Sequence, residues 1–188
     1  MSTTCDIPTA KSQPNNIQVS ALLAALPDEL GIRFGQKEAR HRIVAFLNAA
    51  CSGSKKWLDA NYEMIAKAAT NQQVVLQILL WNKPNLELVN GNIAQHYLRI
   101  NDPRTLIILR DLYVHQDAFK AIREEASVIG YVEKKYHAHH ENNQYTIDLI
   151  DKLATENGVR VAPTLIVDEK AYVGSASING TDLASLLA

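Results

Sequence analysis

The stretch FGQKEARHRIVAFLNAACSGSKKW, residues 34–57, decides the fold. Within it, the run RIVAFL at residues 42–47 has the length and the branched, aromatic composition of a buried strand. From Ser52 to about Thr70, the apolar residues recur at helical spacing instead. This change of period predicts that Cys51 lies at the N-terminus of a helix that directly follows a strand.

The segments on either side of this stretch complete a small sheet unit. Residues 74–81, VVLQILLW, are dense in strand-forming residues, and Pro84 helps to end the run. A strand, a helix and a strand in this order favour parallel pairing with a right-handed crossover. Upstream, residues 31–34 predict a short strand, and residues 19–30 predict a short helix that Pro27 restricts.

The segment from about residue 86 to residue 158 is helical in character, with its apolar residues in spaced clusters. Breaks at residues 101–103, at residues 116–117 and at Gly130 predict several helices rather than one. This block separates the first strands from the end of the chain.

The end of the chain returns to strands. Residues 164–167 and 171–173 are separated by a short polar turn, which predicts an antiparallel hairpin. Thr181 is a suitable cap for a final helix that runs to about Leu187. At the other end, residues 1–17 are rich in Ser, Thr, Asn and Pro and show no apolar period, so we predict a flexible arm there.

Taken in order, these elements resemble a thioredoxin fold. Residues 34–57 resemble the entry strand and active-site helix of the DsbA-like family, and APTLIVDEKAYVG at residues 162–174 resembles its cis-proline loop and terminal hairpin. The long helical block and Trp57 are similar to a subgroup found as soluble domains attached to vitamin K epoxide reductase-like membrane proteins. The resemblance implies one α/β domain over residues 18–188, with a helical insertion at about 86–158 between a βαβ half and a C-terminal ββα half.

Cys51 is the candidate nucleophile. A thiolate is the attacking species in disulfide exchange, and a helix N-terminus stabilises it through the peptide dipoles and free N–H groups. Lys55 and Lys56 add positive charge nearby, and the Ser54 hydroxyl is placed to donate a hydrogen bond to the sulfur. These features predict a lowered pKa for the Cys51 thiol. The alternative is a buried, inert cysteine at the end of a strand.

Two residues depart from the family pattern. Ser54 stands where the resemblance implies a resolving cysteine, and Ala45 stands where it implies a buried acidic residue. A mixed disulfide at Cys51 would therefore need an outside thiol, such as glutathione or a second protein, or less plausibly Cys5. A degenerate, non-catalytic domain explains both departures, and a deliberate replacement of the resolving cysteine explains the first.

Pro163 is the centre of the expected docking edge. A cis proline lacks an N–H and leaves the neighbouring backbone groups to pair with an extended peptide. The alternative is a trans proline that merely starts an edge strand. The resemblance implies the following substrate-binding residues: Ser52, Gly53, Trp57, Ala162, Pro163 and Thr164.

A histidine-rich run at residues 137–141 is the competing signal, because imidazole and carboxylate groups are metal ligands. On a helix, His139 and His140 would diverge, whereas His137 and Glu141 would share a face. Two ligands make an incomplete site. We therefore expect a solvated helix end, no metal and no bound cofactor.

The composition fits a single globular domain. The chain has 188 residues, of which 47% are hydrophobic, and this is enough for a sizeable core. Its formal net charge of -1 gives no support to nucleic-acid binding. The chain has no long apolar run and no export signal at residues 1–16. The bacterial periplasm or cell envelope and the cytoplasm both stay open as locations, and so does a membrane redox partner.

Three functions are compatible with these residues. The first is a thiol-disulfide oxidoreductase-like protein whose partners are protein or peptide thiols and disulfides, with glutathione as a co-substrate. The second is a redox-silent binding module that keeps the fold and the peptide edge. The third is a kappa-class glutathione transferase-like activity, because the resemblance implies a core that those proteins share.

Overall fold

The central sheet has the strand order β1-β3-β2-β4-β5 in the computed structural model, which describes residues 16–176, 183–185 and 187. The parallel pair β2 and β3 runs in register from His41 opposite Val74 to Leu47 opposite Leu80, and all other pairings are antiparallel. The strands are β1 (Ile32–Phe34), β2 (His41–Leu47), β3 (Val74–Leu80), β4 (Thr164–Val167) and β5 (Lys170–Val173).

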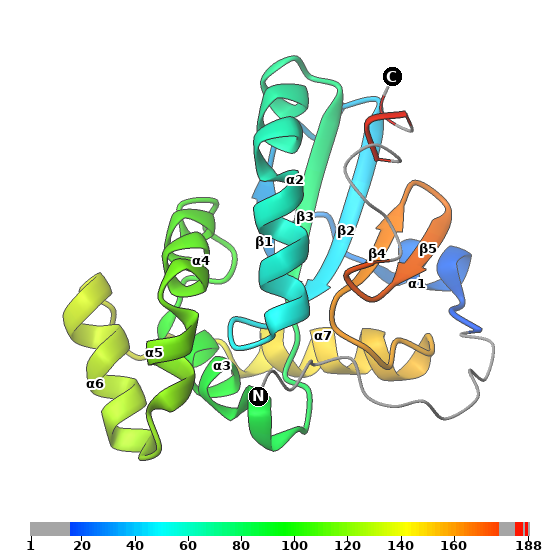
Figure 1. The fold of residues 1–188 in the computed structure, drawn as a ribbon. Coiled ribbons are helices and arrows are strands. Elements are labelled where there is room, and N and C mark those ends of the chain that lie inside the picture. Colours follow the sequence, from blue (N-terminus) through cyan, green and yellow to red (C-terminus); the bar gives the residue numbers. More distant parts are fainter. Residues whose placement is uncertain (1–15, 177–182, 186, 188) are drawn as a thin grey trace.

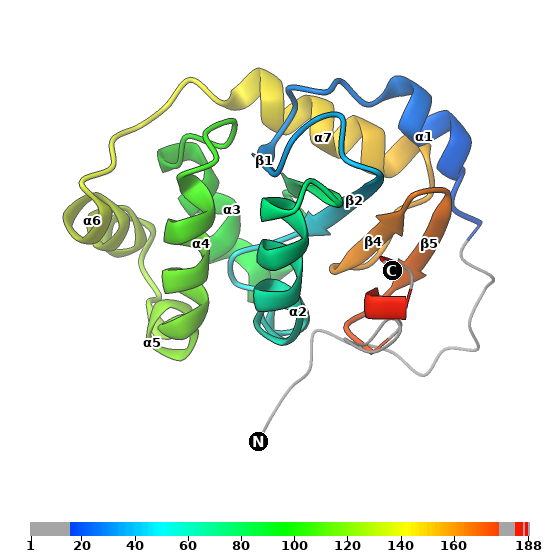
Figure 2. The same cartoon turned by 90° about the horizontal axis from the view of Figure 1, so that it is seen from above.

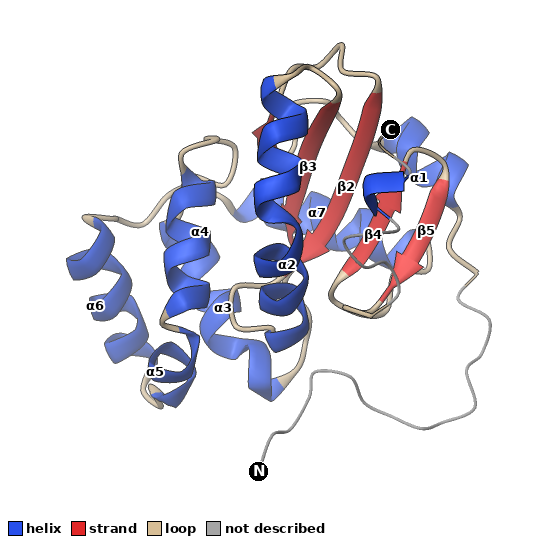
Figure 3. Cartoon of the chain, turned by 45° about the horizontal axis from the view of Figure 1, so that its top comes forward, coloured by secondary structure: helices blue, strands red, loops and turns tan. Residues whose placement is uncertain are grey.

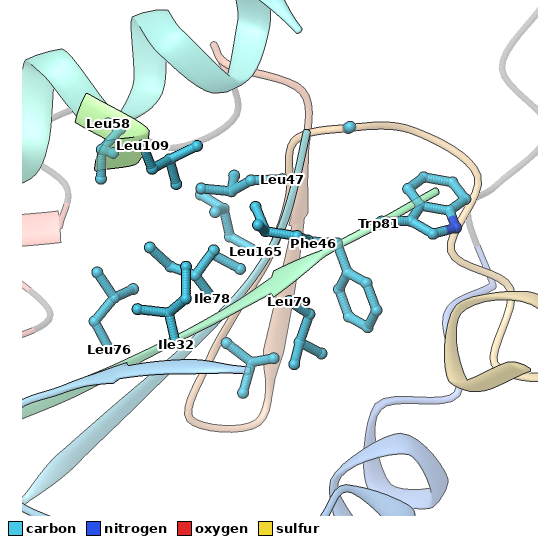
Figure 4. Packing of buried hydrophobic residues seen from close by; sticks show 14 of the residues in the cluster. Ile32, Phe46, Leu47, Leu58, Leu76, Ile78, Leu79, Trp81, Leu109 and Leu165 are labelled. Carbon is cyan, nitrogen blue, oxygen red and sulfur yellow. The ribbon is translucent and has the colours of Figure 1, made fainter. Parts of the chain in front are cut away.

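Helices cover both faces of this sheet (Figures 1 and 2). The long helix α2 (Ser52–Thr70) lies on one face, whereas α1 (Val19–Ala25) and α7 (Gln144–Glu156) lie on the other. Every residue of β3 and the last five residues of β2 are buried, as expected for strands that are covered on both faces. Figure 4 shows this core, in which Leu47, Ile78 and Leu165 come from three neighbouring strands.

The predicted helical insertion is present as a series of short helices beside α2 (Figures 1 and 3). Its last helix, α7, differs from the others because it packs against β3 and α1 and so belongs to the core of the sheet unit. The other elements of the insertion are η1 (Leu86–Leu88), α3 (Val89–Ala94), η2 (Gln95–Tyr97), α4 (Thr105–Val114), α5 (Gln116–Ala121) and α6 (Glu125–Tyr136).

The observed boundaries agree closely with the sequence, and the α/β thioredoxin-like fold with a helical insertion is confirmed. Helix α1 ends at Ala25, before Pro27, because proline cannot continue the hydrogen-bonded ladder. Thr181, the expected cap, and residues 1–15 of the arm expected at residues 1–17 lie outside the described residues. Among the helices in the described part of the chain, none has the length and apolar character needed to span a membrane.

Candidate functional site

Cys51 is the N-cap residue of α2, as the sequence predicts. Its backbone is extended, and its Sγ accepts a hydrogen bond from the backbone N–H of Ser54, with Sγ and N 3.5 Å apart. The thiol also donates to the carbonyl oxygen of Ala162, at an Sγ to O distance of 3.3 Å. The sulfur therefore connects the start of α2 with the segment that leads into β4.

That segment contains the cis Ala162–Pro163 peptide bond. Pro163 packs against the first turn of α2, because a Cβ added to Gly53 would lie 3.0 Å from Pro163 Cδ and 3.7 Å from Cys51 Sγ. The carbonyl of Pro163 accepts from the N–H of Gly174, after β5. Two short segments more than a hundred residues apart thus meet at the sulfur, as the resemblance implied.

Ser54 is placed differently from the expectation. The sulfur contact comes from its backbone N–H, because cap geometry aims this group at the side chain of the cap residue. Its hydroxyl oxygen accepts instead from the backbone N–H of Asn48, at 3.3 Å. Lys55 forms an ion pair with Asp59 at 2.7 Å, so its charge is shared with a carboxylate on the same helix.

The site is covered. Cys51, Ser54 and Thr164 are 0% exposed, and Ala162 is 2% exposed. Ser52 is only partly buried, and its hydroxyl accepts from Lys120 Nζ of α5 at 3.3 Å.

Trp57, another of the expected substrate contacts, lies in the hydrophobic core. It is 1% exposed and belongs to the buried core cluster. A peptide would contact the indole ring, like the Cys51 sulfur, only after the surrounding segments separate. Trp57 therefore supports the first turns of α2 by packing.

Asn48 holds the turn between β2 and α2 together. Its side-chain oxygen accepts from Ala50 N at 2.9 Å, and its amide donates to Trp81 O at 3.1 Å and to Asn92 Oδ1 at 2.8 Å. Its backbone carbonyl accepts from the N–H of Cys51 and from the hydroxyl of Tyr113, at 3.0 and 3.1 Å. One buried residue thus connects the cysteine to β3 and to the insertion.

Two further residues of the insertion brace this turn. The amide of Gln116 donates to the carbonyl oxygens of Ala49 and Cys51, at 3.1 and 3.2 Å. Gly91 of α3 lies so close to the turn that an added Cβ would be 2.1 Å from Asn48 Oδ1. Sequence reasoning missed all of these residues, because polar side chains within short helices give no periodic signal that relates them to a distant turn.

A carboxyl group lies near the same end of the sheet, at the C-terminus of β3. Asp151 of α7 accepts from the backbone N–H of Asn82, at an N to Oδ1 distance of 3.1 Å. Burial raises the pKa of the Asp151 carboxyl from 3.8 to about 6, and the hydrogen bond from Asn82 opposes this shift. Ala45, where the resemblance implied an acid, is 0% exposed in β2.

The histidine-rich run does not form a helix end of the expected kind. Helix α6 ends at Tyr136, His137 adopts a left-handed conformation with φ 50°, and residues 138–143 are irregular. His139 contacts Glu141 at 3.2 Å. Within the described ranges, no three His, Cys, Asp or Glu side chains gather as a metal would require.

The sequence and the fold of this chain are similar to those of known proteins. A family model described as Thioredoxin matches residues 28–184. A search of curated proteins gave no match. Among solved structures, a conserved protein of unknown function from Enterococcus faecalis V583 has a TM-score of 0.83 at 20% sequence identity, covering 96% of this chain and 99% of its own.

Two solved structures with more informative descriptions have the same fold. The catalytic domain of Proteus mirabilis ScsC has a TM-score of 0.60 at 14% identity, over 90% of this chain and 94% of its own. A putative protein-disulfide isomerase from Pseudomonas syringae has a TM-score of 0.65 at 17% identity, over 84% and 98%. The chain therefore belongs to the thioredoxin family, in a form that carries helices inserted between its strands.

Proposed function

We propose that this protein exchanges thiols and disulfides through a single cysteine, forming a mixed disulfide between Cys51 and a peptide or glutathione. The observation that carries the proposal is the position of Cys51 Sγ, at the N-terminus of α2 and 3.3 Å from the carbonyl oxygen that precedes Pro163. The description of the Pseudomonas syringae structure as a putative protein-disulfide isomerase supports the same reaction class.

The exchange needs no bound cofactor. The Cys51 thiolate attacks one sulfur of a disulfide, so that a new S–S bond forms at Cys51 and the other sulfur leaves as a thiolate, which takes up a proton. Ser54 supplies no second thiol at the position of a resolving cysteine. An outside thiolate then attacks the mixed disulfide and returns Cys51 to its reduced form.

The Ala162 carbonyl gives the site a way to hold the substrate backbone. In the reduced protein this oxygen accepts from the Cys51 thiol. Formation of the mixed disulfide removes the S–H donor, so the carbonyl becomes available to a backbone N–H of an extended peptide. The proposed docking edge is therefore Ala162, Pro163 and Thr164, with Ser52 and Gly53 at the start of α2.

The burial of Cys51 slows the access of a substrate disulfide to its sulfur. Cys51 is 0% exposed, so a disulfide reaches the sulfur only when the surrounding segments separate. We expect exchange with a small disulfide to be slow in the folded protein and to accelerate as the turn before α2 opens.

The test is mass spectrometry after incubation of the wild type, Cys51→Ser and Cys5→Ser with oxidised glutathione or a model peptide disulfide. We expect one adduct on the wild type and on Cys5→Ser, located at Cys51 by proteolysis, and none at this position in Cys51→Ser. Turnover with added glutathione then measures whether the mixed disulfide is resolved. An unmodified Cys51 after prolonged incubation would contradict the proposal.

A redox-silent binding module is the second candidate, and the full burial of Cys51 favours it. In that case the same edge binds a peptide without covalent exchange. Peptide binding that is unchanged in Cys51→Ser, together with an inert thiol in the folded wild type, would support this second function.

A further inference from the structure

A cavity of about 500 Å³ opens at the same end of the sheet as Cys51. Its wall comes from residues 81–84 after β3, from Asp151 and Thr155 of α7, and from Val159 and Arg160 in the connection to β4. Figure 4 shows Trp81 at the end of β3, beside this connection. We refer to this space as the Arg160 cavity.

Two observations place the Arg160 cavity close to the Cys51 sulfur. Arg160 is two residues before Ala162, so their Cα atoms are at most about 7 Å apart. Trp81 accepts a hydrogen bond from Asn48, whose carbonyl in turn accepts from the N–H of Cys51. When a peptide is bound along Ala162 and Pro163, a peptide side chain about two residues from the peptide's own cysteine is therefore within reach of the cavity.

The charges around the cavity favour an anion. Lys83 and Arg160 both line it, and neither forms an ion pair with another residue in the described ranges. The Lys83 ammonium lies 5.7 Å from the centre of the Trp81 ring, and Arg160 is exposed. The one carboxyl in the wall, Asp151, accepts a hydrogen bond from the N–H of Asn82. Two unpaired cations beside an apolar indole suit a carboxylate on an aliphatic stem.

We propose that the Arg160 cavity binds an acidic side chain of an extended peptide substrate, and so makes this protein selective for acidic segments next to the reacting cysteine. This selectivity rests on the exchange proposed for Cys51. Lys83 and Arg160 are its specificity-determining residues, and Asp151 opposes them.

The kinetic test uses three short peptides whose cysteine is activated as a mixed disulfide with thionitrobenzoate, and which carry Glu, Gln or Lys two residues from that cysteine. Attack by Cys51 joins the peptide sulfur to Cys51 and releases the coloured thionitrobenzoate anion. We expect the Glu peptide to react fastest and the Lys peptide slowest. Replacing Lys83 or Arg160 by Gln should lower the ratio of the Glu to the Gln rate by about two- to fivefold each, and Asp151→Asn should raise it.

The matched control is Lys152→Gln, which removes an equal charge from the same helix as Asp151 but from a side chain that is 66% exposed and outside the cavity wall. The rate ratio should keep its wild-type value in this variant. Equal rates for the three peptides, or equal losses in Lys152→Gln and Arg160→Gln, would overturn the proposal.

A binding measurement separates this proposal from the exchange chemistry. The full-length Cys51→Ser protein is titrated with fluorescently labelled peptides that carry Ser in place of the reactive cysteine. Tighter binding of the Glu peptide than of the Lys peptide, lost in Arg160→Gln, supports the cavity even if no adduct forms at Cys51. Adduct formation without any preference in binding or rate would refute the cavity and leave the exchange proposal standing.

Discussion

Ser54 is the residue that separates this site from a two-cysteine site. It is fully buried, and its hydroxyl oxygen accepts from the N–H of Asn48. A thiol at position 54 would sit in the same helical turn as Cys51. At this position, a two-cysteine site would therefore differ from the present site only in one atom, a sulfur in place of the Ser54 hydroxyl oxygen.

Ser54→Cys should convert a lasting mixed disulfide into a transient one. The new thiol attacks the Cys51 adduct from within the molecule and releases the bound glutathione, so we expect the adduct measured by mass spectrometry to fall by at least about tenfold.

Ser52→Cys is the matched control for this change. Adjacent residues have Cα atoms about 3.8 Å apart, below the usual range for a disulfide, so the adduct should persist in this variant. A stable adduct on Ser54→Cys would contradict the role assigned to position 54.

Gly91 offers a second test at the scale of a single residue. An added methyl group would lie 2.1 Å from Asn48 Oδ1 and 2.8 Å from Ala50 N, so Gly91→Ala must push the turn and α3 apart. We expect a loss of about 1–3 kcal/mol in the free energy of unfolding by urea.

Gly130→Ala is the control for Gly91→Ala, because nothing lies within 4 Å of a Cβ added there, in the middle of α6. Alanine in an open helical position should stabilise the protein by about 0.5–1 kcal/mol. Equal effects of the two substitutions on the free energy of unfolding would show that the close approach of Gly91 to Asn48 does not determine the cost of a larger residue at position 91.

At the scale of the elements, α5 acts on the cysteine through the backbone rather than through the sulfur. The Gln116 amide is buried and donates to two carbonyls, those of Ala49 and Cys51. A buried carbonyl that loses its donor carries a desolvation cost. The insertion therefore stabilises the closed form of the turn.

Gln116→Met keeps the volume of the side chain but removes both hydrogen bonds. We expect the unfolding free energy to fall by about 1–3 kcal/mol and alkylation of Cys51 in the folded protein to become faster. Gln144→Met, which changes an amide that bonds Asp148 at the surface of α7, should affect neither measurement strongly. Slower or unchanged alkylation in Gln116→Met would mean that α5 does not control access.

The sheet unit was predictable from the sequence, whereas the hydrogen bonds of Asn48 and Gln116 that hold the turn before α2 were not. Residues 43–47 are apolar, residues 74–80 are apolar except for Gln77, and α2 has helical spacing, so local patterns determine these elements. Asn48 and Gln116 are polar residues whose partners lie far away in the chain, and a single sequence contains no signal for such pairings. The position of Cys51 followed from the change of period, but its burial depends on packing by distant segments.

At the scale of the whole molecule, Asp151 makes stability depend on pH. Its carboxyl has a pKa of about 6 in the folded protein against 3.8 as the ordinary value, so the folded state holds the proton more tightly. The contribution of this group to stability is fully present below about pH 4 and is lost as the pH rises through about 6.

Asp151→Asn should therefore stabilise the protein at high pH and not at low pH. The amide oxygen still accepts from Asn82 but carries no charge to bury. We expect a gain in unfolding free energy on the order of 1–2 kcal/mol at about pH 8, which disappears at about pH 4. Urea titrations of both proteins at the two pH values give the measurement, and a gain of equal size at both would rule out titration of Asp151 as its source.

The contact between Gly91 and Asn48 also restricts how this sequence diverges over evolutionary time. Any larger residue at position 91 meets the Asn48 amide, whereas a smaller side chain at position 48 would give up the bonds to Trp81 and Asn92. In homologues that keep this turn, we therefore expect the two positions to be inherited together. A lineage that replaces Asn48 is then free to lose the glycine, and with it the close docking of the insertion on the sheet unit.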